Sequence, residues 1–149
     1  MPTLQIRPAV EADQSTIKAL VQAEQLDPSS LHWSHFVIAE SDGEVAGIGQ
    51  IRPYPGCREL GSLVVKKAFR EQGVGAMIVN ALLEKETGDV YLECESSKEA
   101  YYSRFGFVRI PWYRAPYPLN LKAGAGKVIV GLVYRVKIIV MKREAGKSS

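Results

Sequence analysis

Hydrophobic and polar residues alternate over several short segments of the chain, and this period of two predicts β-strands. At the start, Leu4 and Ile6 alternate with polar neighbours. The predicted extended segments cover residues 4–7, 36–39, 44–51, 59–65, 90–94 and 132–141. Asp42-Gly43 predicts a hairpin turn. Gly47 and Gly49 in the third segment predict the close approach of another backbone or of a ligand. Residues 52–56 are expected to form a loop.

Hydrophobic residues spaced three and four positions apart predict helices between these strands. Ile17, Leu20 and Val21 fall on one face of the first helix, and Asp13 can cap its N-terminus. The longest helical pattern consists of Val74, Met77, Ile78, Ala81 and Leu82. Shorter helical segments and a long irregular connection are also expected, over residues 30–34, 97–104 and 111–131.

The order of these elements predicts an α/β (α+β) fold. A meander of three strands comes first, and the long helix then connects segments 59–65 and 90–94 as a parallel strand–helix–strand unit. The chain has 149 residues, of which 46% are hydrophobic. This length and composition fit one domain over residues 1–149 with a sizeable core.

Composition and charge exclude several classes of function. Residues 122–149 hold seven of the 19 basic side chains and one of the 16 acidic ones. These basic residues interrupt an alternating hydrophobic segment instead of clustering, so a solvated strand face is expected and no nucleic-acid partner. The longest apolar run, Val128–Tyr134, is too short to span a bilayer. With two cysteines, Cys57 and Cys94, and no targeting segment, we expect free thiols and a cytoplasmic location.

The most informative local pattern is the glycine turn at residues 70–75, Arg-Glu-Gln-Gly-Val-Gly, between an apolar strand and the long helix. Main-chain N–H groups at a helix start lack intrahelical partners and face the positive end of the helix dipole, so they suit a diphosphate. Arg70 can add a charge-assisted contact. A tight turn that needs small residues for packing is the alternative. A P-loop is excluded, because no Gly-Lys-Ser/Thr follows, and a Rossmann turn fits poorly after three strands.

Two segments carry a family resemblance. The run Val65-Lys66-Lys67-Ala68-Phe69-Arg70-Glu71-Gln72-Gly73-Val74-Gly75-Ala76 resembles the coenzyme A signature of the GNAT N-acetyltransferase superfamily. The run Ala100-Tyr101-Tyr102-Ser103-Arg104-Phe105-Gly106-Phe107 resembles a later motif of that family. Glu95 departs from the family pattern, which often has Asn seven residues before the tyrosine.

The resemblance implies the GNAT acyl-CoA N-acyltransferase fold, with a mixed central sheet of about six to seven strands and about four helices. It also implies acetyl-CoA as co-substrate and transfer of the acetyl group directly to a primary amine. The cofactor-binding residues that it implies are Leu63, Val64, Val65, Arg70, Glu71, Gln72, Gly73, Val74, Gly75 and Ala76. The pantetheine arm would pair with the main chain of 63–65 like an added strand.

The same resemblance implies two catalytic residues. Glu59 lies where some GNAT enzymes have a general base, and an exposed strand-end carboxylate or an acceptor-binding group is the alternative. Tyr102 lies where the family has a general acid for the departing thiolate, and a buried packing aromatic is the alternative. The main-chain N–H of Val64 or Val65 would face the thioester oxygen.

The acceptor is the least determined part of the function. The segment from Arg52 to Val65 resembles amino-acid N-acetyltransferases of the acetylglutamate-synthase type, which suggests a small amino acid. In that case Arg52, or an arginine of the 111–131 segment, would pair with the acceptor carboxylate. Acetylation of a protein lysine or N-terminus, and a non-catalytic CoA-binding module, remain alternatives. We expect no metal, because His32 and His35 lack neighbours at ligand spacing. Both a monomer and a homodimer are open.

Overall fold

The computed structural model describes residues 3–121, 124 and 137–146. Within this range the chain forms two compact units. The first unit comprises the described residues of Met1–Arg52 and Leu60–Lys85, and the second comprises those of Pro53–Glu59 and Glu86–Ser149. The expectation of one domain over 1–149 stays a prediction.

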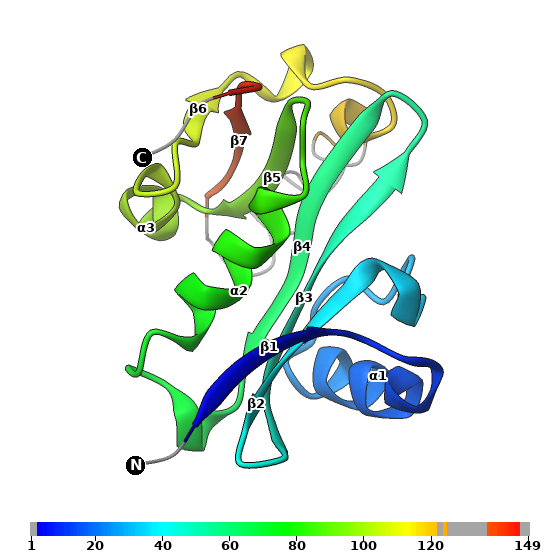
Figure 1. Ribbon diagram of the computed structural model, residues 1–149. Helices are drawn as coiled ribbons and strands as arrows, with labels where there is room; N and C mark the ends of the chain where they lie inside the picture. Colours follow the sequence, from blue (N-terminus) through cyan, green and yellow to red (C-terminus); the bar gives the residue numbers. More distant parts are fainter. Residues whose placement is uncertain (1–2, 122–123, 125–136, 147–149) are drawn as a thin grey trace. The chain divides into compact units, whose positions relative to one another are not determined.

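The first unit contains the predicted meander. Strand β1 (Leu4–Pro8) pairs antiparallel with β2 (Phe36–Ser41), and β2 pairs antiparallel with β3 (Glu44–Tyr54) (Figure 1). The hairpin turn at Asp42-Gly43 is confirmed, with φ of 49° and 82° at these two residues. Such left-handed pairs match the twist of the flanking strands. Strand β4 (Cys57–Val65) follows β3 after a turn.

Helices α1 (Gln14–Ala23) and α2 (Val74–Glu84) cover opposite faces of this meander (Figure 1). On one face, Ile17 and Val21 of α1 share a buried cluster with Ile48 of β3. The residues on either side of Ile48 are glycines that face α2. A Cβ at Gly47 would lie 2.7 Å from the main-chain oxygen of Val64, and one at Gly49 would lie 2.6 Å from Cγ2 of Ile78. The predicted close approach is therefore confirmed, and the approaching atoms belong to β4 and α2.

Three short 3-10 helices complete the first unit: η1 (Glu11–Asp13), η2 (Trp33–His35) and η3 (Lys67–Phe69). The helical segment predicted at 30–34 is thus η2, displaced toward the strand that follows. Asp13 does precede α1, but its side chain makes no capping hydrogen bond to that helix. Its carboxylate accepts instead from the main-chain N of Val10 at 2.7 Å and pairs with Arg7.

The second unit contains β5 (Val90–Glu95), β6 (Val108–Ile110), β7 (Ile138–Arg143), helix α3 (Glu99–Ser103) and the 3-10 helices η4 (Ser96–Lys98) and η5 (Trp112–Arg114). Glu59 of β4 is in parallel register with Tyr91 of β5, as the crossover pattern predicted. Strand β7 pairs antiparallel with both β5 and β6. The order of hydrogen-bonded strands, β1-β2-β3-β4-β5-β7-β6, makes a seven-stranded mixed sheet and confirms the predicted fold class.

Three boundaries differ from the sequence prediction. Residues 52–54 are not a loop, because β3 continues through Arg52 to Tyr54 before the turn. The connection after β6 is less irregular than predicted, since η5 and helical residues 119–121 and 124 lie in it. The last strand occupies Ile138–Arg143, and most of the predicted 132–137 part lies outside the described residues. Within the described residues, no helix combines the length and apolarity needed to cross a membrane.

Candidate functional site

The glycine turn connects β4 with the start of α2 in the first unit. Gly73 is the residue that precedes the helix, and its φ of 79° is left-handed. Glu71, two residues earlier, is also left-handed, with φ of 64°. Where residues with left-handed and right-handed backbone conformations alternate, successive main-chain N–H groups can converge on one point. This geometry binds anions. A Cβ at Gly73 would meet no atom within 4 Å, so the space directly beside this residue is open.

The first turn of α2 leaves main-chain donors available. The first helical hydrogen bond runs from the N of Met77 to the O of Gly73, at 3.1 Å. The N–H groups of Val74, Gly75 and Ala76 precede that bond and therefore have no intrahelical acceptor. Val74 is buried against the unit and anchors the helix start. All of these donors carry the partial positive charge of a helix N-terminus.

Arg70 has partners on both sides of the turn. Its Nε donates to the main-chain O of Val65 at 3.1 Å, which ties the turn to the end of β4. Its Nη2 lies 3.0 Å from Oε1 of Glu24, and both side chains are about half exposed. Gln72 donates to the main-chain O of Ala68 at 3.3 Å. The sequence predicted Arg70 as an anion contact, and the ion pair with Glu24 is an addition that the sequence did not indicate.

Strand β4 carries the other predicted cofactor residues. Val64 is buried, whereas Leu63 and Val65 are partly exposed. The strand is irregular just before them, because Ser62 has a left-handed φ of 51°. The ten predicted cofactor residues therefore lie on one stretch of the first unit, from Leu63 to Ala76.

Glu59 is a buried residue of the second unit. Only 2% of it is exposed, so the alternative of an exposed strand-end carboxylate is wrong. The hydroxyl of Tyr54 donates to its Oε1 across a long 3.5 Å contact. Tyr91 lies beside it on β5, in register. A buried carboxylate beside two tyrosines is compatible with the role of a base and with the role of an acceptor-binding group.

Tyr102 is on α3, also in the second unit. Its ring packs edge-on against Tyr101, with centroids 5.1 Å apart, and against Phe107 at 6.3 Å. Burial raises the pKa of Tyr102 above its ordinary value of 10.0, and nearby Cys94 and Tyr101 raise it further. Tyr102 therefore keeps its proton through neutral and moderately alkaline pH, which is the form a general acid needs.

A buried polar set near β4 was missed at the level of sequence. Gln50 Nε2 and Arg52 Nη2 both donate to Oγ of Ser62, at 2.9 and 3.0 Å. The exposed fractions are 0% for Gln50, 4% for Arg52 and 6% for Ser62. Arg52 Nη2 also lies 3.9 Å from Oδ2 of Asp27. The only signal in the sequence was the position of Gln50 and Ser62, each a polar residue inside a largely apolar strand.

The guanidinium of Arg52 lies directly over Gly61. A Cβ at Gly61 would be 2.5 Å from Nη1 of Arg52, so the absence of a side chain there makes room for the arginine. Arg52 was predicted as a loop arginine and is instead a strand residue. Arg114, the other arginine considered for a carboxylate, is an exposed residue of η5 in the second unit.

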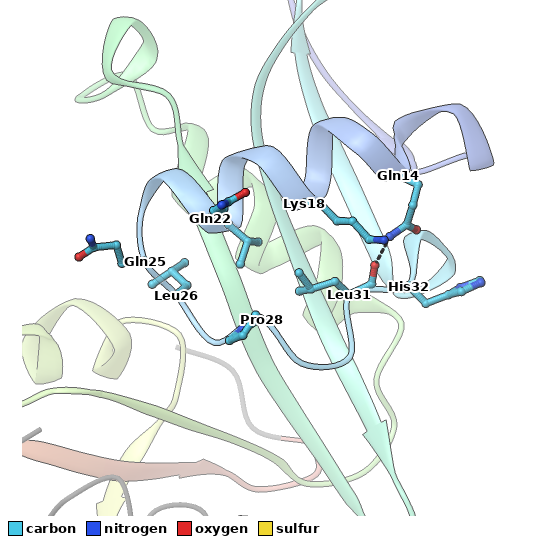
Figure 2. A pocket seen from close by; sticks show the side chains of 9 residues that line it. Gln14, Lys18, Gln22, Gln25, Leu26, Pro28, Leu31 and His32 are labelled. Carbon is cyan, nitrogen blue, oxygen red and sulfur yellow. Dashed lines mark hydrogen bonds between the residues drawn. The ribbon is translucent and has the colours of Figure 1, made fainter. Parts of the chain in front are cut away.

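A pocket of about 660 Å³ lies in the first unit between α1 and the segment 25–32 (Figure 2). Gln14, Lys18 and Gln22 line it from one face of the helix, and Leu26 and Pro28 line it from the segment opposite. None of the sequence-predicted site residues lines this pocket. Its wall includes both neighbours of Asp27, the residue that approaches Arg52.

Comparisons with known proteins identify the family of this chain. The model of the acetyltransferase (GNAT) domain matches residues 32–109, just over half of the chain. The chain belongs to the GNAT acetyltransferase family. No curated protein matches the sequence.

Several solved structures resemble this GNAT chain. N-acetylglutamate synthase from Neisseria gonorrhoeae, complexed with coenzyme A and N-acetyl-glutamate, has a TM-score of 0.77 at 20% identity over 97% of this chain. The match covers 36% of the synthase, so this chain spans about a third of that protein. A Mycobacterium tuberculosis protein in complex with CoA has a TM-score of 0.71 at 19% identity, with 94% and 98% of the two chains covered. An acyl-CoA N-acyltransferase from Pseudomonas aeruginosa has a TM-score of 0.64 at 18% identity, with 96% and 99% covered. These likenesses show the GNAT fold.

Proposed function

We propose that this GNAT chain binds acetyl-CoA and transfers its acetyl group directly to a primary amine of a small molecule. The observation that carries the proposal is the turn between β4 and α2, where Glu71 and Gly73 have left-handed φ, the helix begins, and the position beside Gly73 is open. An anionic diphosphate is the ligand class that this arrangement favours. Two of the resembling structures contain coenzyme A, which supports the same ligand here.

The proposed chemistry assigns the predicted residues as follows. The main-chain N–H groups of residues 72–76 bind the diphosphate, and the main chain of 63–65 pairs with the pantetheine arm. The N–H of Val64 or Val65 donates to the thioester oxygen as negative charge develops on it. Loss of one such donor typically lowers kcat by roughly 10² to 10³.

Proton transfers to and from the protein complete the reaction. An alkylamine has a pKa of about 10.4 and is almost fully protonated at neutral pH, so it must lose a proton before it attacks. We assign this proton to the Glu59 carboxylate, directly or through water. The amine then bonds to the acetyl carbon, the carbon–sulfur bond breaks, and the nitrogen releases its second proton to solvent, which leaves a neutral amide and reprotonates Tyr102 for the next turnover. We assign protonation of the departing thiolate to the hydroxyl of Tyr102, whose raised pKa keeps it protonated at neutral pH.

For the acceptor we propose a small amine that carries a carboxylate, such as an amino acid. Arg52 supports this class, because its planar guanidinium suits the bidentate recognition of a carboxylate.

The test is incubation of the purified protein with acetyl-CoA and a panel of amino acids, polyamines and peptides, followed by mass spectrometry. We expect a mass gain of one acetyl group on an amino acid, together with release of CoA. Turnover on peptides alone would favour a protein acetyltransferase, and CoA binding without any product would favour a non-catalytic module.

The variant Arg52→Lys distinguishes a loss of carboxylate recognition from a general loss of activity. An amino acid and its decarboxylated amine are compared as acceptors in the same variant. We expect kcat/KM to fall more for the amino acid than for the amine, because lysine retains the charge and loses the bidentate fork that suits a carboxylate. An equal fall for both acceptors would remove Arg52 from carboxylate recognition.

A further inference from the structure

Strand β4 departs from regular geometry immediately before the segment assigned to the thioester. Ser62 has φ of 51°, a region that L-residues other than Asn and Asp rarely adopt.

A left-handed serine inside a strand persists only where its surroundings hold it. Here the holding contacts are the two hydrogen bonds that Ser62 Oγ accepts from Gln50 and Arg52. A hydroxyl oxygen has two lone pairs, so these donors use its acceptor capacity completely. Both donors come from β3, two positions apart, and therefore from the same face of that strand.

We propose that Gln50 and Arg52 hold the left-handed backbone of Ser62 through its hydroxyl, and that the three act as positioning residues for acyl transfer. The backbone at Ser62 determines the direction in which the N–H groups of residues 63–65 point. The inference rests on the proposed function, which assigns these N–H groups to the thioester and the pantetheine arm. It adds the side chains that set their direction, none of which contacts the reacting atoms.

The kinetic test compares Ser62→Ala, Ser62→Gly and Ser41→Ala. Ser41, on β2 of the same unit, is 6% exposed like Ser62 and is the matched control. We expect kcat to fall at least tenfold in Ser62→Ala and the affinity for CoA to fall by a smaller factor, because the pantetheine contacts of 63–65 are disturbed while the diphosphate turn remains intact. Glycine adopts positive φ without strain, so Ser62→Gly should retain more kcat than Ser62→Ala. Ser41→Ala should retain wild-type kcat.

Two kinetic outcomes would overturn the proposal. One is wild-type kcat in folded Ser62→Ala and Ser62→Gly, since the polar set would then serve stability only. The other is an equal loss in both variants, since the left-handed backbone would then not be what matters.

A second measurement does not depend on turnover. In amide NMR spectra we expect Ser62→Ala and Gln50→Met to shift the N–H resonances of residues 63–65, and Ser41→Ala to leave them in place. Unchanged resonances at 63–65 in both site variants would contradict the positioning role even if the chain proved inactive. If the resonances move and no amine is acetylated by the wild type, the positioning role stands and the proposed function fails.

Discussion

Arg70 Nη2 lies 3.0 Å from Oε1 of Glu24, so the arginine of the coenzyme A signature already pairs with a carboxylate of its own unit. A bound diphosphate and Glu24 would compete for this guanidinium. Glu24 is the residue after α1, and the segment that follows it lines the pocket beside that helix. The ion pair between Arg70 and Glu24 thus connects diphosphate binding at the turn with the position of the segment after α1.

Glu24→Gln should therefore strengthen CoA binding. The gain should be modest, about fivefold at most, because an exposed ion pair is worth up to about 1 kcal/mol. It should also shrink at high salt, where the repulsion between carboxylate and diphosphate is screened. Calorimetric dissociation constants at low and high salt check this. Glu11→Gln, which removes an exposed acid elsewhere in the same unit, serves as control. Weaker binding in Glu24→Gln would mean that Glu24 organises Arg70 for the ligand instead of competing with it.

Gly73→Ala tests the turn itself. Both Gly73 and Gly43 have left-handed φ, of 79° and 82°, and at both a Cβ would meet no atom within 4 Å. Alanine should thus cost each site a similar free energy of folding, about 1–2 kcal/mol. Only Gly73→Ala places a methyl group where the diphosphate is proposed to bind, so only that variant should lose CoA affinity. Equal CoA affinity in the two variants would argue against the turn as the binding site.

Tyr102→Phe should lower kcat by roughly 10² and leave CoA affinity nearly unchanged, because it removes a proton donor and keeps the ring. Tyr101→Phe is the neighbouring control. The raised pKa of Tyr102 means that the wild type keeps this proton past the usual tyrosine range, so kcat should not fall with the titration of an ordinary tyrosine near pH 10. Rates measured from pH 7 to 10.5 check both points. A wild-type kcat in Tyr102→Phe would exclude this residue as the acid.

Asp13→Asn tests what holds the first helix in place. Arg7 donates two hydrogen bonds to the carboxylate, at 2.8 and 3.0 Å, and these lower the pKa of Asp13 below 3.8, with the N–H of Val10 adding to the effect. A lowered pKa stabilises the folded state fully above the ordinary Asp range and loses this contribution as pH falls through the folded value.

We therefore expect Asp13→Asn to lower the free energy of unfolding by about 1–2 kcal/mol at pH 7, a partly exposed charged hydrogen bond being worth less than a buried one. The difference from wild type should shrink below pH 4. Urea unfolding at pH 7 and pH 3.5 checks this, with Glu44→Gln as a control for net charge. A difference that stays constant with pH would mean that the carboxylate charge is not what matters.

The strands and the glycine turn could be predicted from sequence because short-range patterns determine them. Asp42-Gly43 is a sequence that favours a hairpin turn. The hydrophobic residues of α2 are spaced three and four positions apart, which fits a helix and not a strand. The segment 52–54 was misjudged because Pro53 and Pro55 suggested a loop, whereas β3 tolerates a proline close to its end.

The buried polar residues could not be predicted, since their burial depends on contacts between distant parts of the chain. Gln50 and Arg52 meet Ser62 across ten or more residues, and Glu24 meets Arg70 across 46. For the same reason Glu59 gave no sign that it is buried. The roles of Glu59 and Tyr102, a cytoplasmic location and the expectation of no metal stay predictions.

The central claim is that the main chain of residues 72–76 binds the diphosphate of coenzyme A. Isothermal titration of CoA into the purified wild-type protein and Gly73→Ala, with Gly43→Ala as control, tests it most directly. We expect the wild type and Gly43→Ala to bind CoA with equal affinity and Gly73→Ala to bind it much more weakly. No heat of binding in the folded wild type, or the same affinity in all three proteins, would contradict the claim.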